Sequence, residues 1–123
     1  MNGKKEGLEY AILTDEITKA WSGKSVKQYK KFKNLKKQNL RDNMTNLELV
    51  LNMLAEASTT EISKKQKPKG INENKKIAQK GGNAAKKARI EIEKQTGESI
   101  VSTKNAKQLL LKNKKSLPQN NRN

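Results

Sequence analysis

The hydrophobic positions of this chain are most regular between Thr45 and Ile62, where they repeat at intervals of three and four residues. Such spacing places side chains on one face of an α-helix. The face consists of Leu47, Val50, Leu51, Leu54, Ala57 and Ser58. Thr45, followed three residues later by Glu48, fits a capping box, which predicts where the helix starts. Because Leu49 and Met53 widen the apolar stripe, we expect this helix to form the core with neighbours on two sides.

The residues before this helix predict a tail and two shorter helices. Residues 1–9 contain too few apolar side chains to order themselves, so we expect a flexible N-terminal tail. Thr14 or Asp15 can cap a first helix, and Gly23 can end it because glycine takes a positive φ without steric cost. Ser25 can cap a second helix. The apolar face of that second helix consists of Val26, Tyr29, Phe32 and Leu35.

The residues after the central helix predict a break and then a long helix. Residues 63–70 contain one proline, one glycine and several lysines, a composition typical of a loop. We expect a helix over residues 73–95, with Asn72 or Asn74 as its cap. Its inner face consists of Ile77, Gly81, Ala84, Ala88 and Ile92. These small side chains allow another backbone to approach closely, although the pair Gly81 and Gly82 leaves a kink or a break as an alternative.

The last part of the chain predicts one more helix and a second tail. Gly97 can stop the long helix, and Ser102 or Thr103 can cap a final helix. That helix carries Ala106, Leu109 and Leu110. Residues 112–123 are polar and are expected to be a disordered basic tail. The predicted fold is therefore all-α: a small bundle of about four to five helices with a basic helical hairpin and disordered termini, forming one domain over residues 10–111.

The charge balance points to a polyanionic partner. Lysine and arginine total 28 residues against 12 acidic residues, so the formal net charge is +16. Nucleic acid is the first candidate, followed by an acidic protein surface or anionic lipid. Only Arg41, Arg89 and Arg122 are arginines. Because bidentate recognition of base edges generally uses arginine, the composition favours electrostatic contact with little sequence specificity.

The densest run of basic residues lies on and after the second predicted helix. We predict that this run contacts phosphates and that a smaller set on the long helix adds a second surface. The two sets are Lys24, Lys27, Lys30, Lys31, Lys33, Lys36, Lys37 and Arg41, and then Lys86, Lys87 and Arg89. A solvated face without a ligand is the alternative. Trp21, Tyr29 and Phe32 could stack on bases, but burial is favoured in a chain with so few rings.

Several functional classes find little support in the composition. The chain contains no cysteine and no histidine, so a zinc site and the common Ser-His and Cys-His nucleophiles are not expected. The carboxylates show no pairing that suggests acid-base catalysis. We therefore expect no enzyme activity, no cofactor and no metal. No apolar run is long enough to span a bilayer and no signal peptide is evident, so the protein is expected to be cytoplasmic, with no membrane partner.

Three segments of the chain resemble a known family: YAILTDEITKAWSGKSVKQYKKFKNLKK, LRDNMTNLELVLNMLAEASTTEISKK and NKKIAQKGGNAAKKARIEIEKQTGE. In order and spacing they are similar to the C-terminal half of DNA-damage-inducible protein D, which is related to BRO-type phage antirepressors. The similarity covers about residues 10–110. The features that carry it are Trp21 to Gly23, Lys33 to Lys37, the helix Asn46 to Thr60, and Gly82, Asn83, Ala88 and Ile92 through to Gly97.

The resemblance implies a non-enzymatic regulatory role in the bacterial DNA-damage response or in prophage control. Members of the family are linked with the recombinase filament on single-stranded DNA, whose disassembly they promote, and antirepressor relatives act on repressors. A further domain precedes the matching region in the family. The resemblance implies that this chain is a fragment, the product of a split gene or a short form that stands alone.

Two functional hypotheses follow from the sequence. In the first, the protein binds DNA, or a recombinase filament on DNA, electrostatically through its lysines. In the second, it is a protein-interaction module whose apolar central helix pairs with a repressor, the recombinase or a second copy, and the lysines keep it soluble. A basic ribosome-associated protein is a third possibility on charge alone. Oligomeric state and the choice between single and double strands are left open.

Overall fold

The computed structural model describes residues 2–110, and the side chains of residues 7–110. The described chain consists of helices and their connections, without a strand, which confirms the all-α prediction. The elements are α1 (Asn2–Ser22), α2 (Val26–Phe32), the 3₁₀ turn η1 (Arg41–Asn43), α3 (Asn46–Gln66) and α4 (Gly70–Thr96). Residues 106–110 are also helical. The predicted tail over residues 112–123 lies outside the described residues.

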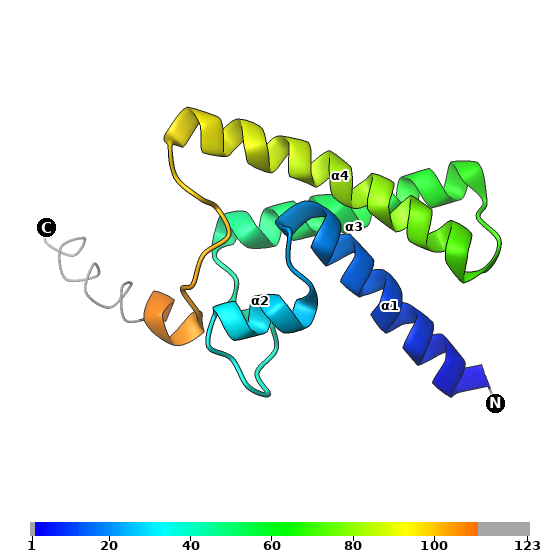
Figure 1. Ribbon diagram of the computed structural model, residues 1–123, viewed down its shortest axis with the longest axis horizontal. Coiled ribbons are helices and arrows are strands. Elements are labelled where there is room, and N and C mark those ends of the chain that lie inside the picture. Colours follow the sequence, from blue (N-terminus) through cyan, green and yellow to red (C-terminus); the bar gives the residue numbers. More distant parts are fainter. Residues whose placement is uncertain (1, 111–123) are drawn as a thin grey trace, which may run out of the picture.

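The two longest helices form the frame of the molecule. Helices α3 and α4 run in opposite directions side by side, and α4 also packs along α1 (Figure 1). The short helix α2 follows the end of α1 and lies below it in the view of Figure 1. None of the helices in the part of the chain that the structure describes is both long enough and apolar enough to cross a membrane.

Helix α1 is longer than the sequence predicts. It begins at Asn2, so residues 2–9 are helical and the prediction of a flexible tail there is wrong. Neither Thr14 nor Asp15 is a cap, because the helix continues through both. The physical reason is cooperativity: once a turn exists and packs on α4, each added residue gains a hydrogen bond at little cost. The helix ends as predicted, with Gly23 at a φ of 83°.

Helix α2 is shorter than the basic run that it was expected to carry. Its start is confirmed, because Ser25 and Gln28 form a complete capping box. It ends after Phe32, where Asn34 takes a left-handed φ of 61° and the Leu35 N–H donates to the Lys30 carbonyl at 2.8 Å. This is the hydrogen-bond pattern of a Schellman motif, in which asparagine replaces the usual glycine. The basic residues after position 34 therefore lie in a loop and in η1.

Helix α3 starts where predicted, with Thr45 and Glu48 forming the capping box, but of its predicted apolar face only Leu51 is fully buried. The buried residues are Glu48, Leu51, Asn52 and Ala55. Leu47, Val50 and Leu54, which were expected in the core, are 38%, 57% and 39% exposed. The inward face includes polar residues because each has a buried partner. For example, the indole N–H of Trp21 donates to Asn52 Oδ1 at 3.0 Å.

Helix α4 is continuous through its glycine pair, so no break occurs there. The pair allows α4 to approach two helices at once: a Cβ on Gly81 would lie 2.6 Å from the Thr59 nitrogen of α3, and one on Gly82 would lie 2.9 Å from the Ile17 carbonyl of α1. The prediction that small residues of α4 allow close approach of another helix is therefore confirmed. Ala78 and Ala85 are buried in it, whereas Ala84 is exposed.

The caps of the last two helices differ from the predictions. Helix α4 begins at Gly70, before Asn72 and Asn74, and the Lys69 N–H donates to the Glu73 carboxylate at 2.7 Å. Its end at Gly97, with a φ of 74°, is as predicted. The helix that starts at residue 106 is preceded by Asn105, whose side-chain oxygen accepts from the Gln108 N–H at 3.3 Å. Ser102 and Thr103 therefore do not cap it.

Candidate functional site

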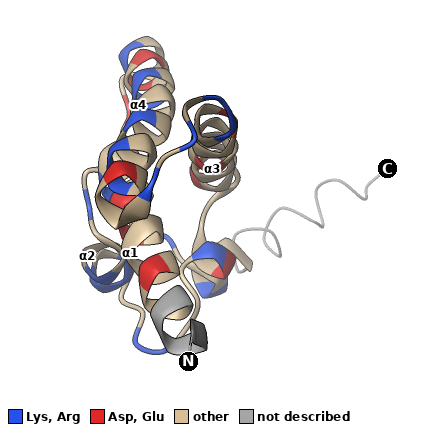
Figure 2. Ribbon diagram, turned by 90° about the vertical axis from the view of Figure 1, so that its right-hand side faces the viewer, with Lys and Arg blue, Asp and Glu red and all other residues tan. Residues whose placement is uncertain are grey.

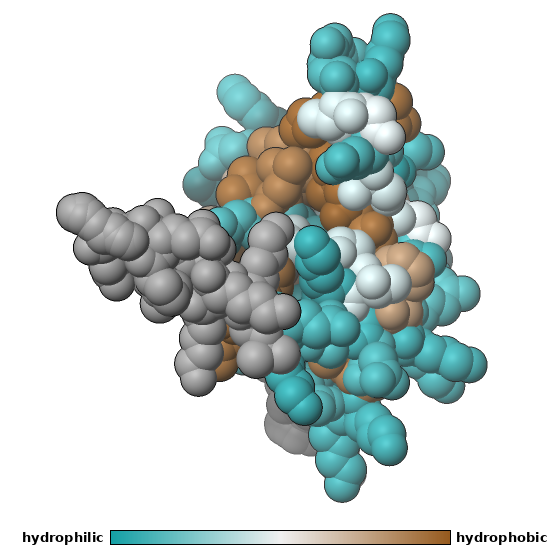
Figure 3. Space-filling model, turned by 90° about the vertical axis from the view of Figure 1, so that its left-hand side faces the viewer, coloured by the Kyte–Doolittle hydropathy of each residue, from teal (hydrophilic) through white to brown (hydrophobic). Residues whose placement is uncertain are grey.

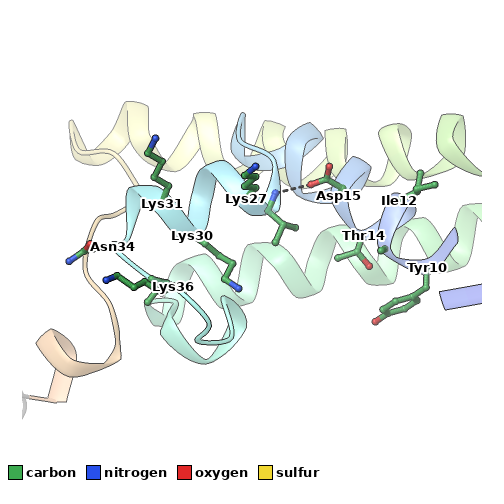
Figure 4. A pocket seen from close by; sticks show the side chains of 12 residues that line it. Tyr10, Ile12, Thr14, Asp15, Lys27, Lys30, Lys31, Asn34 and Lys36 are labelled. Carbon is green, nitrogen blue, oxygen red and sulfur yellow. Dashed lines mark hydrogen bonds between the residues drawn. The ribbon is translucent and has the colours of Figure 1, made fainter. Parts of the chain in front are cut away.

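A groove of about 1010 Å³ lies between α1 and α2 (Figure 4). Four lysines line it, three from α2 and one from the following loop: Lys27, Lys30, Lys31 and Lys36. Its apolar wall consists of Ala11, Ile12, Val26 and Leu35, and Tyr10 stands at one end. Asp15 is the one acidic residue in the lining. The groove is therefore strongly basic at its rim and apolar in its wall.

Local contacts hold the two walls of this groove together. The Asp15 carboxylate accepts a hydrogen bond from the Val26 N–H at 2.7 Å, which joins α1 to the first residue of α2 (Figure 4). The left-handed residue Asn34 then reverses the chain, which returns Lys36 to the groove. Asp15 supplies one negative charge against the four positive charges of the lysines, so the groove keeps a net positive charge.

Three other residues near α2 were predicted to contact phosphates but do not line the groove: Lys24, Lys37 and Arg41. Lys24 lies with its ammonium group 4.3 Å from the centre of the Phe32 ring, which is a cation–π arrangement. Lys37 is exposed in the loop. Arg41 pairs with Glu56 at 2.8 Å, and this hydrogen bond raises the pKa of Arg41. Of these residues, Lys24 and Lys37 are available to extend the basic surface beyond the groove.

Lys33 is a correction to the predicted interface, because its side chain is completely buried. Its ammonium group donates to Glu48 Oε1 at 2.7 Å and to the Lys104 carbonyl at 2.6 Å, and it cannot reach a ligand outside the protein. A signal was present in the sequence. Lys33 follows Tyr29 by four residues and so shares the inward face of the helix turn with it.

Glu48 is the centre of this buried polar cluster. Its two carboxylate oxygens accept hydrogen bonds from the Tyr29 hydroxyl, the Lys33 ammonium group, and the N–H groups of Thr45 and Ser102. Burial, followed by the hydrogen bond to Glu48, raises the pKa of Tyr29, which keeps the phenol neutral. Four donors fill the acceptor capacity of a carboxylate, so this cluster has a structural role and offers no free group to a substrate.

Of the predicted second surface, two residues are exposed and the third is engaged within the fold. Lys86 and Lys87 are exposed on α4, as a surface site requires. Arg89 instead stabilises the fold, because its Nε donates to the Trp21 carbonyl at 2.7 Å and its guanidinium group pairs with Glu93 at 2.9 Å. In Figure 2 the basic residues are spread over several helices, with acidic residues among them on α4. The concentration of lysines without free acids is a feature of the groove.

The aromatic residues separate into buried and exposed ones. Trp21 and Tyr29 are fully buried, as predicted. Phe32 is 38% exposed and faces Lys24. Tyr10 is 74% exposed and lies in the groove, a position that the sequence interpretation missed because it started the first helix at Thr14 or Asp15, after Tyr10.

A second notable surface is apolar. The outward stripe of α3 exposes Leu47, Val50, Met53 and Leu54. Figure 3, which faces the end of the molecule where α3 begins and α4 finishes, shows a broad hydrophobic area bordered by hydrophilic residues. Exposed apolar patches commonly mark contact surfaces.

Within residues 2–110, no group of three or more acidic residues is placed to hold a metal ion. Comparisons of the chain with protein-family models, with curated proteins and with solved structures find no match. The resemblance to DNA-damage-inducible protein D therefore stays a prediction.

Proposed function

We propose that this protein is a non-enzymatic regulator that binds nucleic acid electrostatically through the groove between α1 and α2. The observation that carries the proposal is the gathering of Lys27, Lys30, Lys31 and Lys36 around one groove whose single carboxylate is already bonded to the backbone. Phosphates bound there release the counterions that they hold in solution, which drives association. The net charge of +16 adds long-range attraction to a polyanion.

The binding is expected to depend little on base sequence. Base edges are commonly read by arginine through two parallel hydrogen bonds. The two arginines in the described chain are already engaged, Arg41 with Glu56 and Arg89 with Glu93. Lysines act as point charges, which suit phosphates rather than bases. Following the family resemblance, we propose that the target is DNA, or a recombinase filament on DNA, in the damage response or in prophage control.

The experiment compares two variants of equal charge. One replaces the four groove lysines by glutamine; the control replaces exposed lysines elsewhere, at Lys65, Lys76, Lys94 and Lys107. Affinity for labelled single-stranded and duplex DNA is measured by fluorescence anisotropy. Four lost phosphate contacts correspond to a loss of about 100-fold near physiological salt. Equal losses in the two variants would show that net charge, and not the groove, determines binding.

The outward stripe of α3 favours a second candidate, a protein-interaction module. A triple variant with Leu47→Gln, Val50→Lys and Leu54→Gln changes exposed positions only, so it should fold. If the second candidate is correct, this variant loses self-association in sedimentation, or co-sedimentation with repressor or with recombinase filaments. The groove variant would retain them. The reverse pattern favours nucleic-acid binding.

A further inference from the structure

We propose that the groove binds single-stranded rather than duplex nucleic acid, with a base stacked on Tyr10 and neighbouring phosphates held by the groove lysines. This inference rests on the proposed function and specifies the form of its ligand. Three features of the groove carry it: the availability of one ring, the apolar wall and the placement of the charges.

Tyr10 is the ring of this protein that is free to stack. The chain contains one Trp, two Tyr and one Phe. Trp21 and Tyr29 are fully buried against each other, and Phe32 is only partly exposed and already faces the Lys24 ammonium group at 4.3 Å. Tyr10 is 74% exposed in a groove wall. A large exposed ring beside lysines is the arrangement that single-strand-binding proteins use, because every base has a flat face on which a ring can stack.

The apolar wall distinguishes a single strand from a duplex. A duplex keeps its bases stacked inside and presents phosphates and sugars to a protein outside its grooves. Bound to a duplex backbone, Ala11, Ile12 and Val26 would stay in contact with water. A single strand can turn its bases outward, and their apolar faces can cover this wall while the phosphates remain at the rim.

The charges are placed for a strand that crosses the groove. Figure 4 shows Tyr10 at one end, and Lys31, Asn34 and Lys36 at the other, with Lys30 between them. A strand with one base on Tyr10 can therefore place its following phosphates beside the lysines of α2 and its loop. Acidic proteins also carry negative charge, but they lack the flat bases that Tyr10 requires.

The test separates stacking from charge. Anisotropy is measured with a labelled thymidine oligomer of about 16 nucleotides, the upper end of single-strand site sizes. It is repeated with a duplex and with a sugar-phosphate oligomer without bases, both of the same length. Tyr10→Ala should weaken binding to the thymidine oligomer between about fivefold and about 100-fold, the range for one lost base stack. It should leave binding to the oligomer without bases unchanged. Tyr10→Phe, which keeps the ring, should bind like the wild type.

Each outcome has one meaning. Circular dichroism and the urea midpoint should be unchanged in Tyr10→Ala, because the ring is largely exposed. Equal affinity for duplex and single strand, or equal loss with and without bases, would overturn the inference. So would a polyglutamate chain that competes as well as the oligonucleotide. If these results appear while the groove lysines remain necessary for binding, the proposed function survives. If no nucleic acid binds at all, both fail.

Discussion

At the scale of single residues, Glu48 shows how a charged side chain can belong in a core. It is fully buried, and its carboxylate joins Tyr29 of α2 and Lys33 just after that helix to the start of α3 and to Ser102. Removing two charges from water is expensive, and here the cost is offset by an ion pair with Lys33 and by three further hydrogen bonds. The cluster consequently fixes where α2 lies relative to α3, and with it the groove.

Substitution of Glu48 should therefore be severe. Glu48→Gln leaves the Lys33 ammonium group buried without a counter-charge, and we expect a loss of about 3–5 kcal/mol in the free energy of unfolding. Arg41→Gln breaks an ion pair of comparable length whose side chains are 45% and 39% exposed, and it should cost no more than about 1 kcal/mol. Urea unfolding measures both. Similar losses would show that the Glu48 carboxylate is in contact with water.

The raised pKa of Tyr29 predicts that the free energy of unfolding depends on pH. Burial raises its pKa in the folded protein above the ordinary value of about 10. Because the unfolded chain loses this proton first, the contribution of Tyr29 is fully present below that ordinary value. It falls as pH rises above it, by up to about 1.4 kcal/mol per pH unit. The difference in unfolding free energy between wild type and Tyr29→Phe should shrink accordingly. Tyr10→Phe is the control, because it removes an exposed hydroxyl instead of the buried one that bonds Glu48.

At the scale of elements, the glycine pair of α4 sets how closely the three long helices pack. Gly81→Ala would place its methyl group against the Thr59 backbone of α3, and Gly82→Ala would meet the Ile17 carbonyl of α1. Backbone atoms cannot move aside as easily as the end of a side chain. We therefore expect each substitution to lower the free energy of unfolding by about 1–3 kcal/mol or more. Gly7→Ala is the matched control, since nothing lies within 4 Å of its added methyl. It should be neutral or stabilise by up to about 1 kcal/mol. A stabilising Gly81→Ala would contradict this packing.

The helix ends that were predicted correctly have local signals. Ser25 with Gln28, Thr45 with Glu48, and the glycines at 23 and 97 all act within a few residues of themselves. The inward face of α3 was not predictable in this way. It depends on partners distant in sequence: Asn52 bonds a tryptophan 31 residues away, and Glu48 bonds a lysine 15 residues away. A pattern of apolar spacing contains no information about such pairs, so the wrong face was chosen.

The candidate site was predictable in part for the same reason. The four groove lysines lie close together in sequence, so the density of basic residues along the chain was enough to predict them: Lys27, Lys30, Lys31 and Lys36. Tyr10 joins them only because α1 extends back through it. A helix over residues 10–15 places positions 10, 11, 14 and 15 on one side, and all four line the groove. The length of α1 depends on its packing against α4, which no local signal indicates.

At the scale of the whole molecule, nucleic-acid affinity can depend on the net charge of +16 or on the lysines of the groove alone. Lys and Arg residues lie on several helices in the view of Figure 2, so regions other than the groove are also expected to attract a polyanion at low salt. Only contacts that displace counterions from the nucleic acid affect the slope of affinity against salt. The slope therefore reports how many lysines touch phosphates, independently of total charge.

Four phosphate contacts from the groove correspond to a slope of about −3 in a plot of log affinity against log salt concentration for a single strand. Lys27→Gln with Lys31→Gln should bring it to about −1.5. The matched control is Lys86→Gln with Lys87→Gln, which removes the same charge from exposed positions on α4. This variant should keep the wild-type slope if the second surface makes no phosphate contact. If that surface does contact phosphates, the slope should change by the same amount as in the groove variant. Anisotropy titrations at several salt concentrations measure all three slopes. A wild-type slope near zero would exclude phosphate binding, and the exposed stripe of α3 would then be the surface through which the protein acts.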